Sequence, residues 1–287
     1  MKNFKIKSYC KINLSLKVVR KLSSGYHNIA SLITFSELHD LISISQISGL
    51  KDKVSFSGRF KNGINKKSNT VIKVLKLLRR NKLLEKQYFK INIQKNIPHG
   101  SGLGGGSSNA ADLLNYLNYK MKLKLKKREI KNFAKQIGFD VPINLERKNC
   151  FLTGKKDEIL RFNLKFKLNL LVVYPNLVCS TKKIYKANKV KSSLKTKSFF
   201  GLKNKKKLID FLKNENNDLE KTVIKLYPKV RQIIDFIKAQ NGCYFSRITG
   251  SGSACIGIFS DMKSTIFAQK LIKLKFPKYW CAISKTM

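Results

Sequence analysis

Ile97-Pro98-His99-Gly100-Ser101-Gly102-Leu103-Gly104-Gly105-Gly106-Ser107-Ser108-Asn109-Ala110-Ala111 is the stretch that decides the fold of this chain. Before it, residues 88–94 alternate between apolar and polar side chains, which predicts a strand. After it, apolar residues from Ala110 to Met121 recur at helical spacing, and Ser107 or Ser108 stands where an N-cap is expected. The sequence therefore predicts a strand, a glycine loop and a helix in succession.

The glycine loop has the composition of a phosphate-binding site. Five glycines between Gly100 and Gly106 remove the Cβ atoms that would hold a ligand away from the backbone, and they permit positive φ angles. The helix that follows adds unpaired N–H groups and a partial positive charge at its N-terminus. A flexible linker or a tight strand-to-helix turn is the alternative, but such a turn needs only one or two glycines. We therefore expect this loop to bind phosphate.

Two common phosphate loops are excluded by what is missing. Gly100, Gly102 and Gly105 match G-x-G-x-x-G, but the dinucleotide fingerprint also requires an acidic residue about 20 residues further on. Residues 120–128 contain only basic and apolar side chains. A Walker A loop requires a lysine after its last glycine, and here a serine follows Gly106. A cation that assists phosphate transfer must therefore come from elsewhere in the chain.

The composition of the 287 residues, with 43% hydrophobic and 10% aromatic residues, is that of a globular protein and excludes a disordered one. No run reaches the roughly 18 apolar residues of a membrane span, and the lysines near the N-terminus interrupt any signal-peptide core. We therefore expect a cytoplasmic protein without a membrane partner. The six cysteines lack the spacing of a metal site or a secreted disulfide framework.

The formal net charge of +44 would ordinarily indicate a nucleic-acid-binding protein. However, 51 of the 60 basic residues are lysines spread over every predicted helix, and only nine are arginines. Arginine is the residue whose planar guanidinium donates paired hydrogen bonds to phosphates and base edges. We favour a compositional bias over a dedicated binding face, and we expect no specific nucleic-acid partner, only non-specific adhesion to polyanions at low salt. A basic nucleic-acid-binding protein remains the alternative.

Three further segments carry candidate functional side chains. On an early predicted strand, Lys11 and Asn13 share one face and could both reach into a cleft, although an exposed lysine is the default in this chain. Tyr26 and His27 have flat faces suited to stacking on a base or sugar, although such residues are often ordinary surface residues. Asp140 is noticeable among only 16 acidic residues, and a helix N-cap or a turn residue is its alternative role.

Later segments complete the pattern. A second glycine site, Thr249-Gly250-Ser251-Gly252, precedes a strand predicted over residues 255–259, and a helix that carries Tyr185 is predicted to begin at Ser180-Thr181. Helices and strands mix without a long βαβ series, which predicts an α+β fold rather than a doubly wound sheet.

These motifs resemble those of the GHMP kinases, the small-molecule kinases named after galactose, homoserine, mevalonate and phosphomevalonate. The first is Cys10-Lys11-Ile12-Asn13-Leu14, the second is the glycine-serine loop at 98–111, and the third is the glycine site at 249–252. Gly25-Tyr26-His27 and Gly138-Phe139-Asp140-Val141-Pro142 are most similar to family members that phosphorylate a cytidine diphosphate-linked methylerythritol in the non-mevalonate pathway of isoprenoid synthesis.

The resemblance implies a two-domain α+β fold. Residues 1–160 would form an ATP-binding N-terminal domain like the second domain of ribosomal protein S5, and residues 161–287 a ferredoxin-like C-terminal domain, with the active site between them. It also implies transfer of the γ-phosphate of ATP, with Mg²⁺, to the 2-hydroxyl of that small-molecule substrate, by a monomer or weak dimer. Another GHMP-type alcohol kinase is the alternative within the family.

The resemblance also assigns roles to residues. Lys11 and Asp140 would be the catalytic pair, and no metal ligand is assigned beyond Ser107 or Ser108. The residues that would hold ATP are Asn69, Pro98, His99, Gly100, Ser101, Gly102, Leu103, Gly104, Gly105, Gly106, Ser107 and Ser108. The residues that would hold the substrate, with aromatic rings flanking its cytosine, are Asn13, Tyr26, His27, Thr181, Tyr185, Gly250, Ser251 and Gly252.

Overall fold

The computed structural model describes residues 3–23, 27–154, 158–189 and 204–287. The chain forms two compact units, and each is assembled from separate stretches of sequence. Unit 1 comprises Met1–Lys11, Leu38–His99 and Gly104–Arg147, whereas unit 2 comprises Ile12–Glu37, Gly100–Leu103 and Lys148–Met287. The expected domain boundary at residue 160 stays a prediction.

The sheet of unit 1 places its apolar residues on one face. Strand β5 (Tyr88–Gln94) pairs in parallel with β4 (Lys53–Ser57) and antiparallel with the second half of β3 (His27–Ile47), which also pairs with β1 (Phe4–Asn13). Every second residue of β5 is buried, and the residues between them carry Lys, Asn or Gln side chains. This alternation is what gives a sheet one face in the core and one in solvent.

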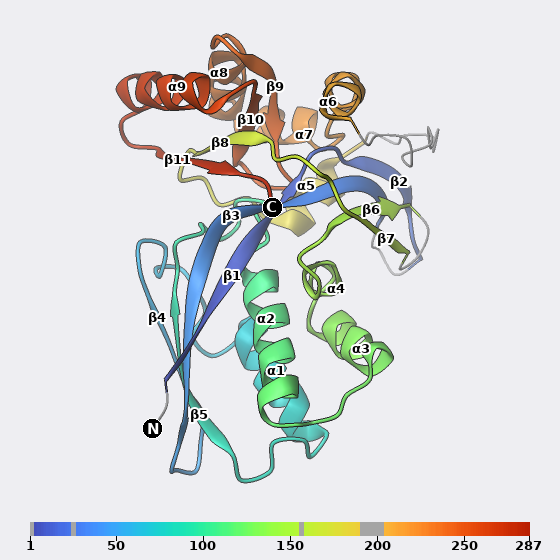
Figure 1. The fold of residues 1–287 in the computed structure, drawn as a ribbon, viewed down its shortest axis with the longest axis vertical. Helices are drawn as coiled ribbons and strands as arrows, with labels where there is room; N and C mark the ends of the chain where they lie inside the picture. Colours follow the sequence, from blue (N-terminus) through green and yellow to red (C-terminus); the bar gives the residue numbers. More distant parts are fainter. Residues whose placement is uncertain (1–2, 24–26, 155–157, 190–203) are drawn as a thin grey trace. The chain divides into compact units, whose positions relative to one another are not determined.

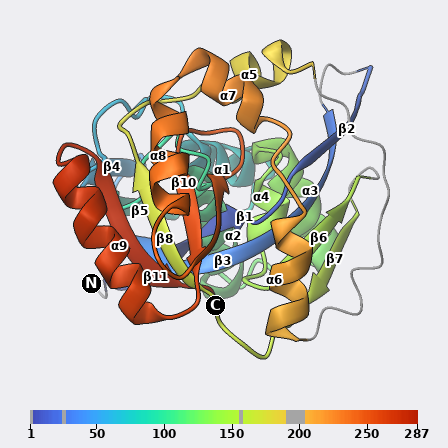
Figure 2. The same cartoon turned by 90° about the horizontal axis from the view of Figure 1, so that it is seen from above.

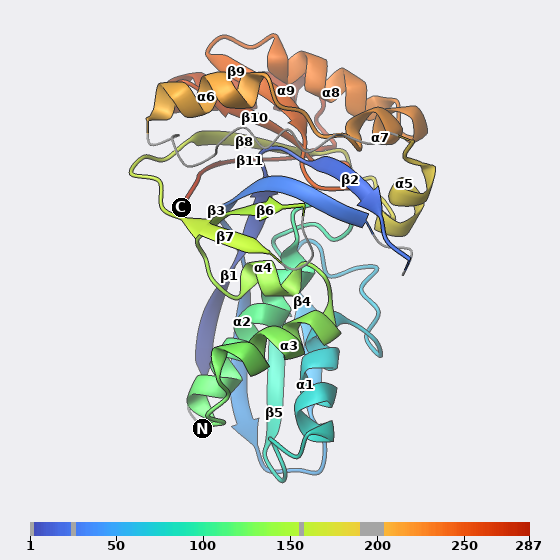
Figure 3. The ribbon, with the colours of Figure 1, turned by 90° about the vertical axis from the view of Figure 1, so that its right-hand side faces the viewer.

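The described residues of unit 1 form four helices: α1 (Thr70–Arg80), α2 (Gly105–Lys120), α3 (Lys127–Ile137) and α4 (Val141–Asn144). Figures 1 and 3 show α1, α2 and α3 together on one face of the sheet. Their apolar side chains pack with those of β3 and β5 into a single core, which contains Leu78, Leu113, Leu114 and Ile91. Helix α2 thereby holds a fixed position behind the glycine loop that precedes it.

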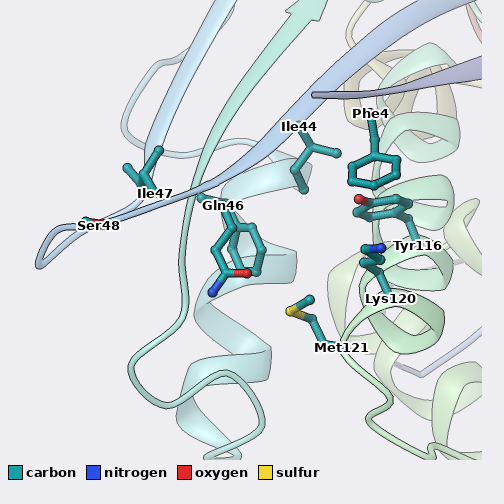
Figure 4. A pocket seen from close by; sticks show the side chains of 9 residues that line it. Phe4, Ile44, Gln46, Ile47, Ser48, Tyr116, Lys120 and Met121 are labelled. Carbon is teal, nitrogen blue, oxygen red and sulfur yellow. The ribbon is translucent and has the colours of Figure 1, made fainter. Parts of the chain in front are cut away.

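A hollow of about 430 Å³ opens in unit 1 where β5 begins and α2 ends. Figure 4 shows its side chains, with the Phe4 and Tyr116 rings and Lys120 lying close together on one side. The Lys120 ammonium lies 4.5 Å from the centre of the Phe4 ring. None of the residues expected to bind ATP or substrate lines this hollow.

Unit 2 contains a four-stranded antiparallel sheet in the order β11 (Trp280–Lys285), β8 (Asn169–Tyr174), β10 (Cys255–Phe259) and β9 (Cys243–Ile248). Figures 2 and 3 show α8 (Lys229–Lys238) and α9 (Met262–Lys275) over one face of this sheet. Shorter helices in the same unit are α5 (Thr181–Ala187), α6 (Lys205–Lys213) and α7 (Glu220–Leu226).

The remaining strands of unit 2 pair with the first half of β3. Strand β2 (Lys17–Lys21) and strand β6 (Asn149–Thr153) are both antiparallel to it, and β7 (Ile159–Phe162) pairs with β6. The early predicted strand that carries Lys11 and Asn13 is the end of β1, and β3 runs without interruption through Asp40.

Among the described residues, no helix has the length and apolar character required to cross a membrane.

Candidate functional site

The glycine loop leads directly into α2, as expected, but the helix begins earlier than expected. Helix α2 starts at Gly105, and its N-cap is Gly104, whose φ of 68° lies in the left-handed region. The expectation that Ser107 or Ser108 is the N-cap is therefore wrong. Three adjacent glycines allow the chain to turn at Gly104 and enter the helix at once, so the serines lie in its first turn.

This early start places the unpaired N–H groups of α2 on glycine backbone. The first intrahelical bond runs from the Ser108 N–H to the Gly104 carbonyl, 3.0 Å away, so the N–H groups of the three preceding residues have no acceptor within the helix. With no side chain at Gly105 or Gly106, a phosphate can approach those groups closely, and the partial charge of the helix N-terminus favours an anion.

Lys11 lies across the start of this helix. A Cβ atom added at Gly104 would stand 2.7 Å from the Lys11 Cγ, so the glycine is required for the lysine to pass. The Lys11 ammonium reaches to 3.4 Å from a carboxylate oxygen of Asp140, and the two side chains are 5% and 41% exposed. The structure thus brings the two expected catalytic residues together, beside the N-terminus of α2.

Asp140 occupies the N-cap position of α4, but its side chain makes no capping hydrogen bond. Its backbone is fixed through Asn144, which donates a side-chain hydrogen bond to the Asp140 carbonyl. Asn144 in turn accepts a 2.8 Å hydrogen bond from the Ser108 hydroxyl. The chain from Ser108 to Asn144 to Asp140 therefore ties the first turn of α2 to the segment that carries the carboxylate, and leaves that carboxylate for Lys11.

Asn69 and His99 also lie in unit 1. Asn69 is the N-cap of α1, and its side chain accepts a hydrogen bond from the Ile72 N–H. The next residue, Thr70, donates a 2.7 Å hydrogen bond to the Gly106 carbonyl, which ties the start of α1 to the glycine loop. Burial, and then the positive charge of Lys95, lower the pKa of His99 from its ordinary value of 6.5.

In unit 2 the two glycine sites meet backbone to backbone. The Ala254 N–H donates to the Ser101 carbonyl at 3.0 Å. A Cβ atom added at Gly102 would lie 2.0 Å from the Thr249 carbonyl oxygen, and one at Gly252 would lie 1.9 Å from the Ser101 carbonyl carbon. Only glycine fits at these two positions, so both sites are built for close backbone contact with each other.

Asn13 joins the same cluster. Its N–H donates to the Thr249 hydroxyl at 2.9 Å, and its side chain donates to the Ser31 hydroxyl at 2.8 Å. The neighbouring Ser251 hydroxyl lies 2.9 Å from that of Thr181. Five of the eight expected substrate residues lie within or directly beside this cluster: Asn13, Thr181, Gly250, Ser251 and Gly252.

The aromatic candidates of unit 2 are His27 and Tyr185. Their rings stack on each other, with centres 5.1 Å apart and planes 26° apart. In this arrangement a base can stack on the outer face of either ring, but it can enter between them only if they separate. Tyr26, the third aromatic candidate, lies outside the described residues.

A residue that the sequence pattern did not indicate, Asn217, holds the second glycine site in place. Asn217 is 3% exposed and donates from its side chain to the carbonyls of Ile248 and Gly250, at 3.3 and 2.8 Å. Its side-chain oxygen accepts from the Leu219 N–H. The local sequence offers only an Asn-Asp pair at 217–218, which is typical of a helix start and does not indicate a contact with the glycine site.

Comparison with known proteins identifies the family. The family model described as "GHMP kinases N terminal domain" matches residues 69–146, and that described as "GHMP kinases C terminal" matches residues 202–277. The chain belongs to the GHMP kinase family. The predicted GHMP kinase fold, with its mixed helices and strands, is thereby confirmed.

Individual relatives place this GHMP kinase within the family. It is 42% identical, over the full length of both chains, to the 4-diphosphocytidyl-2-C-methyl-D-erythritol kinase of Pelagibacter ubique. It is 34% identical to the kinase of the same name from Wolbachia pipientis, over 98% of this chain and 97% of that one.

Solved structures agree on the fold. One is a 4-(cytidine 5'-diphospho)-2C-methyl-D-erythritol kinase, with a TM-score of 0.76 at 22% identity and 99% of each chain covered. Another is a homoserine kinase from Cytophaga hutchinsonii, with a TM-score of 0.72 at 14% identity, covering 100% of this chain and 95% of that one. At these low sequence identities, the similarity to both structures shows the fold alone.

Proposed function

We propose that this GHMP kinase transfers the γ-phosphate of ATP to the 2-hydroxyl of 4-diphosphocytidyl-2-C-methyl-D-erythritol, a step of isoprenoid synthesis by the non-mevalonate pathway. The observation that carries the proposal is the Lys11–Asp140 pair at 3.4 Å, next to a glycine-started helix N-terminus. Full-length identity of 42% to a kinase of that name supports the choice of acceptor.

The proposed chemistry is an in-line displacement at phosphorus. The substrate hydroxyl oxygen forms a bond to the γ-phosphorus, the bond from that phosphorus to the β,γ-bridging oxygen breaks, and ADP leaves. Asp140 orients the hydroxyl and takes its proton, work that contributes roughly 10²- to 10⁴-fold in rate. Lys11 offsets the negative charge on the transferring oxygens, which is the cation that the glycine loop itself lacks.

The donor nucleotide would bind at the glycine loop and the start of α2. We propose that the N–H groups at the start of α2 hold its phosphates, because they are unpaired within the helix and faced by glycine. The full proposed ATP-binding set is Asn69, Pro98, His99, Gly100, Ser101, Gly102, Leu103, Gly104, Gly105, Gly106, Ser107 and Ser108.

Mg²⁺ would enter with the nucleotide. Among the described residues, no group of three or more His, Cys, Asp or Glu could hold a metal ion. This fits Mg²⁺, which keeps several waters and binds through few protein groups plus substrate phosphates. Ser107, which is partly exposed, suits this role better than Ser108, whose buried hydroxyl already donates to Asn144. Bound there, Mg²⁺ would neutralise charge on the phosphates.

The acceptor would bind in unit 2. We propose that Asn13, Thr181, Gly250, Ser251 and Gly252 bind its polar groups and that His27, Tyr185 and Tyr26 stack on its cytosine. The stacked pair of His27 and Tyr185 supports this, because it offers a flat aromatic face in the same unit as the glycine cluster. The proposed domains are residues 1–160 and 161–287, and the proposed setting is the cytoplasm, as a monomer or weak dimer.

The deciding experiment is acceptor-dependent release of ADP from Mg-ATP. The acceptors are 4-diphosphocytidyl-2-C-methyl-D-erythritol, mevalonate, homoserine and galactose, each at the same concentration. We expect turnover with the cytidyl acceptor alone and competition by cytidine nucleotides. Turnover with one of the other alcohols instead would retain the kinase and overturn the proposed acceptor.

A further inference from the structure

A buried carboxylate of unit 1, which none of the roles above uses, joins the two ends of the phosphate loop. Asp40, in the middle of β3, is 0% exposed. One of its oxygens accepts hydrogen bonds from the N–H groups of Asn96 and Ile97, at 2.7 and 2.9 Å. These two residues follow β5 and lead into the glycine loop, so Asp40 fixes the entrance of the loop.

The other Asp40 oxygen reaches the exit of the loop. It accepts from the Lys95 ammonium and, at 3.1 Å, from the side-chain amide of Asn109 in α2. The Lys95 ammonium also donates to the Asn109 side-chain oxygen at 2.9 Å. Asp40, Lys95 and Asn109 are 0%, 3% and 2% exposed, so each member of this triad has its partners inside the protein.

The position of the triad explains why such a costly arrangement is useful there. An ion pair between two buried charges is expensive to desolvate and is weak evidence of a stabilising role by itself. Here the pair connects the residues before the loop to the helix after it, and a Cβ atom added at Gly105 would lie 3.4 Å from an Asp40 oxygen. The triad therefore fixes the position of the first N–H groups of α2 relative to the residues that follow β5.

We propose that Asp40, Lys95 and Asn109 are positioning residues for the nucleotide phosphates, with Asn109 the member that connects the helix to the charge pair. The triad acts through the backbone of the loop, and it touches neither nucleotide nor acceptor. This proposal rests on the proposed function for its ligand, ATP.

Asn109→Ala is the informative variant. It detaches the helix from the triad and leaves the Asp40–Lys95 ion pair and the two backbone hydrogen bonds to Asp40 in place, whereas removing Asp40 or Lys95 would strand a buried charge and risk loss of the fold. The matched control is Asn118→Ala. Asn118 lies nine residues further along α2, and it too both donates and accepts, with the Leu125 carbonyl and N–H as partners.

The measurement is binding of a non-hydrolysable ATP analogue with Mg²⁺ by calorimetry, together with KM for ATP and for the cytidyl acceptor. For Asn109→Ala we expect roughly a tenfold weaker analogue Kd and a similar rise in KM for ATP, because a buried hydrogen-bonding link is lost. KM for the acceptor should not change. Asn118→Ala should bind the analogue as the wild type does, and both variants should retain the wild-type circular dichroism spectrum.

An unchanged analogue Kd in folded Asn109→Ala would overturn the proposal, and so would equal weakening in both variants. If Asn109→Ala does not fold, Asn109→Ser replaces it, since a serine hydroxyl is too short to reach both partners and the same outcomes apply. The analogue titration needs no acceptor, so a failure of the cytidyl acceptor to react would count against the proposed function and leave this test intact.

Discussion

The Lys11 ammonium and the Asp140 carboxylate lie 3.4 Å apart, but the lysine side chain is 5% exposed and the aspartate side chain 41%. The lysine is held by packing against Gly104, whereas the carboxylate remains open to an arriving molecule. This asymmetry suits a fixed cation for phosphate and an accessible base for a hydroxyl, and it separates the effects expected from the two substitutions.

Asp140→Asn should lower kcat by at least about 100-fold, because an amide cannot accept the hydroxyl proton. The Kd of the ATP analogue should change little, since the glycine loop is left intact. Stopped-assay turnover and calorimetry measure the two quantities. Near-normal turnover would remove Asp140 from the mechanism.

Lys11→Met should lower kcat by roughly 100-fold or more, because a preorganised positive charge on the transferring phosphate is lost while the apolar stem is kept. The control is Lys7→Met, which removes an exposed lysine from the same strand, four residues earlier and on the same side of it. Steady-state kinetics of the two variants would contradict the role of Lys11 if they lost activity equally.

Gly104→Ala and Gly106→Ala should have opposite effects on stability. Alanine at residue 104 must adopt a φ near 68° and crowd the Lys11 stem, so we expect a loss of about 1–2 kcal/mol in the free energy of unfolding. Residue 106 lies inside α2 with its nearest obstacle, the Thr70 hydroxyl, at 3.5 Å, so alanine there should add about 0.5–1 kcal/mol. Urea denaturation measures both, and changes of the same sign would refute this account of the turn.

The stability of the wild type should depend on His99 between about pH 7.5 and pH 5. Burial and Lys95 lower its pKa in the folded state, so the unfolded chain takes up the proton more readily as the pH falls. Stability is therefore greatest above pH 6.5 and is lost on acidification. His99→Gln removes this contribution, and the free energy of unfolding of wild type minus variant should decrease from pH 7.5 to pH 5. A difference independent of pH would show that His99 is not the group responsible.

The secondary structure on both sides of the glycine loop could be predicted from the sequence. The alternation in residues 88–94 and the helical spacing after Ala110 identified β5 and α2, because both elements bury one regular face against a common core. The alternation after Lys11 also placed that lysine and Asn13 on one side of a strand. What it did not show is that both are buried, at 4% and 2% exposure, since partners distant in sequence determine burial.

Other features could not be predicted from local pattern. Serine is a better N-cap than glycine in general, but a run of glycines lets the helix start before the serines. Asp40 lay in an ordinary apolar segment, and Asn217 lay in an ordinary helix start. Their importance comes from hydrogen bonds to residues about 30 to 70 positions away, which no short-range periodicity encodes.

Strand β3 has a consequence for synthesis of the chain on the ribosome. Its second half pairs with β5 and belongs to unit 1. The last residue of unit 1 is Arg147, so all residues of this unit have been made at that point in translation. The first half of β3 belongs to unit 2, where the Met287 N–H donates to the Phe35 carbonyl and β11 is a strand of the second sheet. Residues 12–37 therefore emerge early but gain their last described partners only once Met287 has been made. Nascent unit 1 should resist protease first, and unit 2 should become resistant only after Met287 has emerged from the ribosome.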